Sequence, residues 1–177
     1  MTGSVIWFTG LPASGKTTLA NEVRERLNER GVACCVLDGD VVRQVTAPVL
    51  GYSEQARAAF YGVLAGLAAE LAGQGLVVLV PATAHRRAYR ERARRLAPAF
   101  LEVWVTPPLE ECQRRDDKGL YAVARSKPGK LPGVGVPYER PQSAAVAASG
   151  GRDREALDAI VAWVTESRRP GSQVDAR

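Results

Sequence analysis

Residues 10–17 read Gly10-Leu11-Pro12-Ala13-Ser14-Gly15-Lys16-Thr17, and they follow the short apolar run Val5-Ile6-Trp7-Phe8. The spacing G-x-x-x-x-G-K-[ST] between a strand and a helix is typical of a loop that binds phosphate groups. Its glycines let the backbone turn N–H groups inward toward phosphate oxygens. Lys16 would add a positive charge, and the Thr17 hydroxyl would ligate Mg²⁺. We predict that this stretch, the phosphate loop, binds ATP and Mg²⁺ together with Thr18 in the following helix.

The length of 177 residues suits one domain, which we expect over residues 1–169 with a tail over residues 170–177. No apolar stretch reaches the roughly 20 residues of a membrane span, and we expect neither a membrane partner nor a signal peptide. The three cysteines lack metal-site spacing, so a reducing cytoplasm is the expected compartment. A net charge of +5 favours an anionic partner, either a nucleotide or a nucleic acid.

Six arginines gather in one segment, at Arg86, Arg87, Arg90, Arg92, Arg94 and Arg95. On a helix they would spread over several faces and form no single stripe, and only Tyr89 is interleaved with them. We interpret the segment as a solvated helix with one or two arginines turned toward the phosphate site, rather than as a nucleic-acid surface.

Apolar runs alternate with helical patterns along the chain. Strands are predicted over residues 4–8, 32–37, 76–80, 100–105 and 144–147. Helices are predicted over residues 16–30, 41–45, 54–72, 86–96, 108–115 and 153–167. This alternation predicts an α/β fold of three layers, α/β/α, around a mainly parallel sheet, as in P-loop NTPases. Residues 116–141 fit no element of ordinary length, and we interpret them as a lid segment.

Two aspartates, Asp38 and Asp40, follow the second predicted strand, where a parallel sheet opens to its ligand. The third strand ends without a carboxylate, so these two are the candidates for organising Mg²⁺ and for orienting or accepting the proton of an attacking hydroxyl. The sequence does not divide the two roles between them. Our working assignment is Thr17 and Asp38 for the metal, with Lys16, Asp38 and Asp40 as catalytic residues. A plain helix-capping role for both aspartates is the alternative, and a dinucleotide site is less favoured because the loop lacks G-x-G-x-x-G.

A small nucleotide-binding domain with a lid is typical of a kinase that phosphorylates a small molecule. Phosphoryl transfer to a hydroxyl requires the exclusion of water, which a closing lid provides, and basic residues neutralise charge. Arg114, Arg115 and Lys118 lie where the helix before the lid ends. We assign Arg114 and Arg115 to ATP binding. The alternative is that these cations only stabilise the end of a helix.

The chain resembles the adenylylsulfate kinases, which use MgATP to phosphorylate the 3′-hydroxyl of adenosine 5′-phosphosulfate. The similarity covers about residues 5–141. It rests on Ile6-Trp7-Phe8-Thr9-Gly10-Leu11, Leu37-Asp38-Gly39-Asp40, Leu50-Gly51-Tyr52-Ser53, Pro108-Leu109-Glu110, Arg115-Asp116-Asp117-Lys118-Gly119-Leu120-Tyr121 and Pro137-Tyr138-Glu139. The phosphate loop alone indicates only a nucleotide site, whereas the Asp-Gly-Asp and Lys-Gly-Leu-Tyr motifs are much more selective.

The resemblance implies an acceptor site with an aromatic ring and several cations. Tyr52 would pack on the substrate nucleotide, and Arg43 and Arg57 would reach its phosphosulfate, because a planar guanidinium grips an oxyanion through two hydrogen bonds. On the same basis we assign to the acceptor Asp40, Phe60, Thr83, Lys118, Leu120 and Leu131. The family is often dimeric, so the resemblance also implies a homodimer.

The chain departs from the family mainly in this acceptor site. The departures are Val41 for an asparagine, Phe60 for an asparagine, Gly62 and Val63 for two arginines, Pro81-Ala82-Thr83-Ala84-His85 for Ala-Phe-Ile-Ser-Pro, and Leu131-Pro132-Gly133 for Phe-Thr-Gly. Losing a polar contact built for one substrate costs discrimination, because the group it served is left unpaired. We interpret His85 as a loop histidine without a chemical role.

Two functions follow. The favoured one is phosphorylation of adenylylsulfate, and the other is phosphorylation of a different small-molecule alcohol by the same chemistry. A non-catalytic nucleotide-binding module and a polynucleotide kinase remain as alternatives from other classes.

Overall fold

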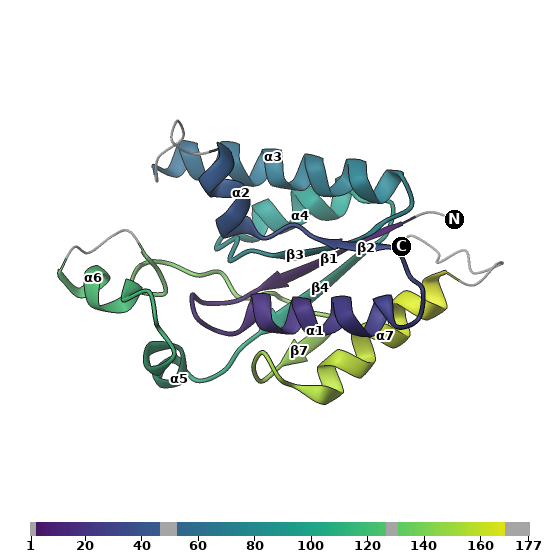
Figure 1. The fold of residues 1–177 in the computed structure, drawn as a ribbon. Coiled ribbons are helices and arrows are strands. Elements are labelled where there is room, and N and C mark those ends of the chain that lie inside the picture. The colour runs from purple at the N-terminus through teal and green to yellow at the C-terminus, as the bar shows by residue number, and fades with distance from the viewer. Residues whose placement is uncertain (1–2, 47–52, 127–130, 169–177) are drawn as a thin grey trace.

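A five-stranded parallel sheet forms the centre of the molecule in the computed structural model, which describes residues 3–46, 53–126 and 131–168. In spatial order its strands are β2 (Cys34–Val36), β3 (Val77–Pro81), β1 (Ser4–Thr9), β4 (Phe100–Val105) and β7 (Val146–Ala148). Helices α1 (Lys16–Asn28) and α7 (Arg154–Ser167) cover one face, and α3 (Glu54–Gly73) and α4 (Arg87–Leu96) cover the other (Figure 1). The predicted three-layer α/β fold is confirmed.

The central strand β1 explains why its residues read as one apolar run. Its side chains alternate between two cores: Ile6 and Phe8 pack with α1 and α7, whereas Val5 and Trp7 pack with α3 and α4. All six residues of the strand are buried. Because the neighbouring strands run parallel to β1, their carboxyl ends open at the edge where the phosphate loop begins.

Capping side chains set the starts of three helices. The Ser53 hydroxyl accepts a hydrogen bond from Ala56 N at 3.1 Å at the start of α3, and Asp153 accepts one from Ala156 N at 3.0 Å at the start of α7. Helix α2 (Gly39–Thr46) begins earlier than predicted because Asp38 Oδ1 accepts from Asp40 N at 2.8 Å. Helix α1 ends earlier than predicted, before Gly31, whose φ of +67° turns the chain toward β2.

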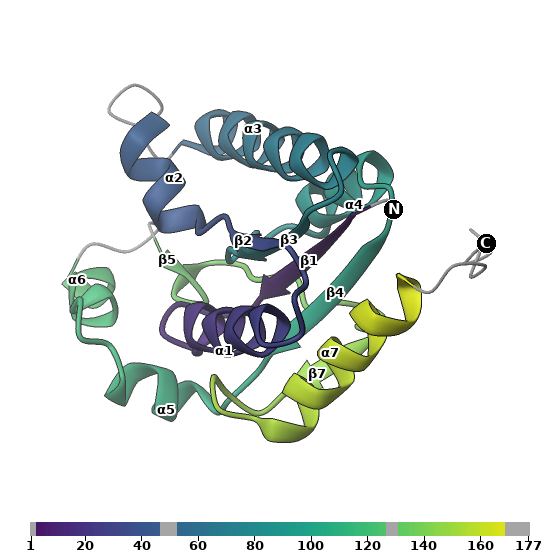
Figure 2. The same ribbon diagram turned by 45° about the vertical axis from the view of Figure 1, so that its right-hand side comes forward.

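The lid lies beyond the carboxyl ends of the strands, apart from the three layers (Figure 2). Helix α5 (Leu109–Arg114) leads into it, and the lid contains α6 (Leu120–Ser126) and two short paired strands, β5 (Leu131–Pro132) and β6 (Gly135–Val136). Sequence reasoning found none of these lid elements, because a seven-residue helix and two-residue strands are too short to show a period.

We predicted that one or two arginines of residues 86–95 point toward the phosphate site, and this prediction is wrong. Arg90 is 1% exposed, and its guanidinium contacts Glu102 Oε1 at 2.6 Å, Ala84 O at 2.5 Å and Glu139 O at 2.8 Å. The other oxygen of Glu102 binds Arg94 at 3.1 Å. Arg90 and Arg94 are therefore held by the buried carboxylate of Glu102 on β4 and not by the phosphate site.

Two predictions about the ends of the chain remain untested. The domain of residues 1–169 stays a prediction, and the tail of residues 170–177 lies outside the described residues. Within the described ranges, no helix combines the length and apolar character required to cross a lipid bilayer.

Candidate active site

The phosphate loop joins β1 to α1 in a conformation that requires its glycines. Gly10 has a φ of +153°, and a Cβ there would lie 2.2 Å from Val105 O. Gly15 has a φ of +96°, and a Cβ there would lie 2.5 Å from Gly151 N. In the described part of the chain, Ser14 Oγ is one of two buried side-chain polar atoms without a hydrogen-bond partner. The close-packed backbone and this buried hydroxyl fit a loop that receives phosphate oxygens.

Lys16 bends back over its own loop. Its Nζ donates hydrogen bonds to Leu11 O at 2.7 Å and Gly10 O at 3.1 Å. Part of its surface stays accessible, yet the surrounding protein desolvates the amine and lowers its pKa to about 8, although nearby Asp40 and Asp38 favour the charged form. The lysine is therefore positioned as a cation whose charge a bound polyphosphate would stabilise.

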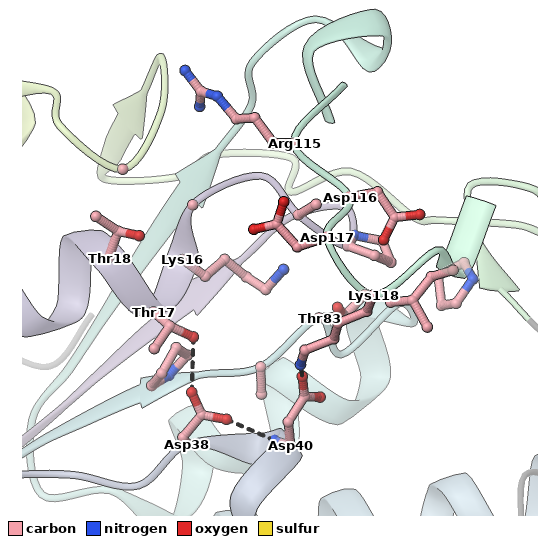
Figure 3. Close-up of a pocket in the computed structure, with 18 of the residues that line it drawn as sticks. Lys16, Thr17, Thr18, Asp38, Asp40, Thr83, Arg115, Asp116, Asp117 and Lys118 are labelled. Carbon is pink, nitrogen blue, oxygen red and sulfur yellow. Dashed lines mark hydrogen bonds and ion pairs between the residues drawn. The ribbon is translucent and has the colours of Figure 1, made fainter. Parts of the chain in front are cut away.

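Asp38 connects the phosphate loop to the start of α2. The Thr17 hydroxyl donates a hydrogen bond to Asp38 Oδ2 at 2.8 Å, while Asp38 Oδ1 accepts from the backbone of Asp40 (Figure 3). One oxygen of Asp38 thus caps α2 while the other faces Thr17, so helix capping does not exclude metal binding by this side chain. A hydroxyl and a carboxylate oxygen are ligands of the kind that Mg²⁺ takes, with water and phosphate completing its shell. The residues present fit Mg²⁺ at Thr17 and Asp38.

Asp40 faces the lid. Its Oδ2 contacts Lys118 Nζ at 2.9 Å, and this contact raises the pKa of Lys118 (Figure 3). Both side chains keep most of their surface exposed, so the pair lies at the mouth of the site rather than in the core.

A cavity of about 1560 Å³ gathers most of the predicted site residues. Those that line it are Pro12, Ala13, Gly15, Lys16, Thr17, Thr18, Asp38, Asp40, Arg43, Arg57, Thr83, Arg115, Lys118, Leu120 and Leu131. Tyr52 lies outside the described residues. The cavity opens between the phosphate loop, the start of α2 and the lid, so it can hold two ligands side by side.

Five predicted residues do not line this cavity. Gly10 and Ser14 lie buried within the loop, and Leu11 packs against Gly133 of the lid. Arg114 is exposed and contacts Glu111 at 3.5 Å. Phe60 is 1% exposed, and the guanidinium carbon of Arg43 lies 3.8 Å from its ring centroid. Phe60 can therefore affect an acceptor indirectly, through Arg43 or through Tyr61, whose ring it meets edge-on at 5.2 Å and which lines the cavity.

The turn between β7 and α7 was missed by sequence reasoning. Its residues Ser149-Gly150-Gly151-Arg152-Asp153 line the cavity, and a Cβ on Gly151 would lie 2.7 Å from Thr18 Cβ. The Asp153 carboxylate accepts hydrogen bonds from Ala156 N and Ser149 N. These bonds fix the turn and lower the pKa of Asp153. The signal was available, because a glycine pair follows the last strand at the carboxyl edge of the sheet.

His85 is not among the residues that line the cavity. The side chain is 4% exposed, its ring meets Tyr89 edge-on at 5.5 Å, and its Nδ1 lacks a hydrogen-bond partner within the described ranges. Burial, and then the charge of Arg57, lower its pKa to about 4. Near neutral pH this pKa favours the uncharged imidazole, and the absence of a chemical role for His85 stays a prediction.

The profile of one protein family, adenylylsulphate kinase, matches residues 2–149 of the chain. The chain belongs to the adenylylsulphate kinase family. An adenylyl-sulfate kinase from Synechococcus sp. (strain JA-2-3B'a(2-13)) is 43% identical over 143 residues, which cover 79% of this chain and 81% of the relative. The bifunctional enzyme NodQ of Azospirillum brasilense is 46% identical over 145 residues, and the chain spans only 23% of that longer protein.

The structure supports the same family. The Mycobacterium tuberculosis APS kinase CysC, solved in complex with AMPPNP and APS, matches with a TM-score of 0.82 at 38% identity, covering 94% of this chain and 99% of that one. Both the predicted kinase class and the family resemblance are confirmed. For this adenylylsulphate kinase family member, the roles of individual residues remain predictions.

Proposed function

We propose that the chain transfers the γ-phosphoryl group of ATP to the 3′-hydroxyl of adenosine 5′-phosphosulfate, giving 3′-phosphoadenosine 5′-phosphosulfate and ADP. The observation that carries the proposal is that one cavity brings the phosphate loop within reach of Asp38, Asp40 and the lid residue Lys118. The solved relative in complex with AMPPNP and APS supports the same pair of substrates.

The donor half of the site is assigned to the phosphate loop. Backbone N–H groups of the loop and the Lys16 ammonium bind the phosphates of ATP, and Arg115 contacts the nucleotide from the other wall of the cavity. Thr17 and Asp38 would hold Mg²⁺, which would supply positive charge to the phosphates. Asp38 is assigned to the metal because it already bonds the Thr17 hydroxyl.

The acceptor half is assigned to α2, α3 and the lid. Arg43 and Arg57 bind the phosphosulfate group, and Asp40 accepts the proton of the attacking hydroxyl. The hydroxyl oxygen forms a bond to the γ-phosphorus, the bond from that phosphorus to the β,γ-bridging oxygen breaks, and ADP leaves. Lys118, on the lid, contacts Asp40. The lid excludes water, so that the phosphoryl group is transferred to the alcohol instead of being hydrolysed.

The experiment is a coupled assay of ADP release by the purified chain with MgATP, with and without adenylylsulfate. We expect ADP release that depends on the acceptor. Lys16→Ala should lose turnover while keeping the circular dichroism spectrum of the parent. A folded parent chain that binds ATP but releases no ADP with adenylylsulfate would overturn the proposed acceptor.

One observation favours a second acceptor, a different small-molecule alcohol. Leu131 and Pro132 line the cavity at positions where the resemblance implies phenylalanine and threonine, so the lid side of this acceptor site is reshaped. Adenylylsulfate and other hydroxylated metabolites should therefore be compared in the same assay, with kcat/KM deciding between them.

We also propose a cytoplasmic location and a homodimer. Cys34, Cys35 and Cys112 are free thiols, in keeping with a reducing compartment. The homodimer follows only from the resemblance. Sedimentation equilibrium of the purified chain tests it, and a monomer at micromolar concentration would overturn it.

A further inference from the structure

We propose that Tyr121 is a positioning residue that couples the lid to the phosphate loop, by holding the Pro12 carbonyl and so aiming the Ala13 N–H group at the cavity. This inference rests on the proposed function for the identity of the ligand. It adds a residue outside the cavity lining that sets the geometry of the phosphate site.

The carrying contact joins α6 to the loop. Tyr121 is 2% exposed, and its hydroxyl donates a hydrogen bond to Pro12 O at 2.9 Å. Around it lies a small apolar cluster, separate from the two cores of the sheet, which we call the lid cluster. Its members are Cys112, Tyr121, Ala124 and Leu131, with Leu11, Ala13 and Val134 packed against them. Two residues of the phosphate loop are thus packed against the lid.

Peptide geometry converts this contact into an effect on the cavity. In a trans peptide the C=O and the following N–H point in opposite directions. Because the Pro12 carbonyl points to the Tyr121 hydroxyl, the Ala13 N–H points in the opposite direction, and Ala13 itself lines the cavity. Ala13 has a φ of +58°, which an alanine adopts only at a cost in energy. A contact from outside the loop, such as the hydrogen bond from Tyr121, would help to keep this peptide in place.

The hydroxyl of Tyr121 is suited to be a permanent donor. Burial raises its pKa, so the group stays protonated across the neutral range. Removing it would leave the Pro12 carbonyl without this partner in a part-buried position.

The same turn of the lid reaches the acceptor half. Asp116 Oδ2 accepts a hydrogen bond from Tyr121 N at 2.7 Å, which closes the turn of residues 116–121 around Gly119 with its φ of +65°. Lys118, inside this turn, contacts Asp40. One short turn therefore contacts the acceptor-side carboxylate and, through Tyr121, the phosphate loop.

The test is Tyr121→Phe, which removes one oxygen and keeps the ring. Binding of ADP is measured by calorimetry without an acceptor, followed by kcat and the KM values for ATP and adenylylsulfate. We expect ADP binding to weaken about threefold to tenfold, as for loss of one hydrogen bond. The KM for ATP should rise in parallel, while the KM for adenylylsulfate changes less than twofold. The matched control is Tyr89→Phe, because Tyr89 stacks on Tyr61 at 4.8 Å and does not line the cavity; we expect it to bind ADP like the parent.

A structural role alone would lower the melting temperature without nucleotide and leave the ADP affinity unchanged, and that result would overturn the inference. ADP binding needs no acceptor, so a failed adenylylsulfate assay leaves this readout intact. If the parent turns over adenylylsulfate and Tyr121→Phe binds ADP as tightly as the parent, the role of Tyr121 is overturned while the proposed function stands.

A second measurement begins with the parent protein and uses inorganic pyrophosphate as the probe. Pyrophosphate should slow trypsin cleavage after Arg125 on α6 in the parent and do so less in Tyr121→Phe. An unchanged cleavage rate in the parent, with pyrophosphate bound, would overturn the coupling.

Discussion

Asp40 on α2 and Lys118 on the lid form an ion pair of 2.9 Å between positions 78 residues apart. With both side chains about 70% exposed, the pair contributes less than about 1 kcal/mol to the free energy of unfolding. Lys118→Ala should therefore leave the melting temperature nearly unchanged. It should lower kcat about tenfold to a hundredfold, because Asp40 loses the cation that orients it and the developing charge loses a partner. Lys118→Arg should recover part of the activity, and full activity of Lys118→Ala would contradict the assigned role.

The affinity for ADP should fall as the pH rises above about 8. Burial lowers the pKa of Lys16 to about 8, whereas bound phosphates favour its charged form. Above that pH, binding must take up a proton, so the dissociation constant should rise by up to about tenfold per pH unit. Calorimetry between pH 7 and 9.5 measures this. Lys16→Arg stays charged throughout and should give a flatter profile, even if its affinity is lower. Parallel profiles would show that Lys16 is not the titrating group.

His85 should make the folded state less stable in mild acid. Its pKa in the folded chain is about 4, below the ordinary value of 6.5, because burial and then Arg57 disfavour its charged form. The unfolded chain therefore binds a proton first as the pH falls from about 6.5 to about 4. The free energy of unfolding drops in that window by up to about 1.4 kcal/mol per pH unit.

The measurement is urea unfolding at several pH values for the parent and for His85→Asn. His85 is the single histidine of the chain, so the variant should lose the part of the slope that arises from it. An identical slope in both proteins would place the titration elsewhere.

Arg90 should be required for stability rather than for chemistry. Arg90→Met leaves the buried Glu102 with only the partly exposed Arg94, and breaking one side of a buried pair costs about 3–5 kcal/mol. Urea unfolding measures the loss. Arg95→Met, on the exposed side of the same helix, should change stability by less than about 0.5 kcal/mol and is the matched control. Equal stability of the two variants would contradict the importance of the buried pair.

The parts of the fold that the sequence predicted are those with strong local patterns. Strands β1 and β3 are mainly apolar and fully buried, and β4 is apolar apart from Glu102. The spacing of the phosphate loop is specific to phosphate-binding loops. The Asp38 and Asp40 pair was placed because the carboxyl ends of parallel strands meet at one edge.

The rest depends on contacts that no local pattern carries. Glu102 reads as a polar residue in a strand, and only the packed structure shows that Arg90 neutralises it. Phe60 was assigned to the acceptor by resemblance, yet it lies beneath Arg43 because α2 folds over α3. The Tyr121 contact with Pro12 spans 109 positions, a separation that periodicity cannot bridge.

The close approach of Gly15 to Gly151 has a consequence for the order of events during synthesis. A Cβ on either glycine would overlap the other segment, so the nucleotide pocket is completed by two turns at nearly opposite ends of the described chain. A nascent chain that has emerged only through β4 carries the whole phosphate loop, but it lacks both the lid residues and the turn between β7 and α7 that line the pocket. We therefore expect a nascent chain to bind nucleotide only after β7 and the turn that follows it have been synthesised.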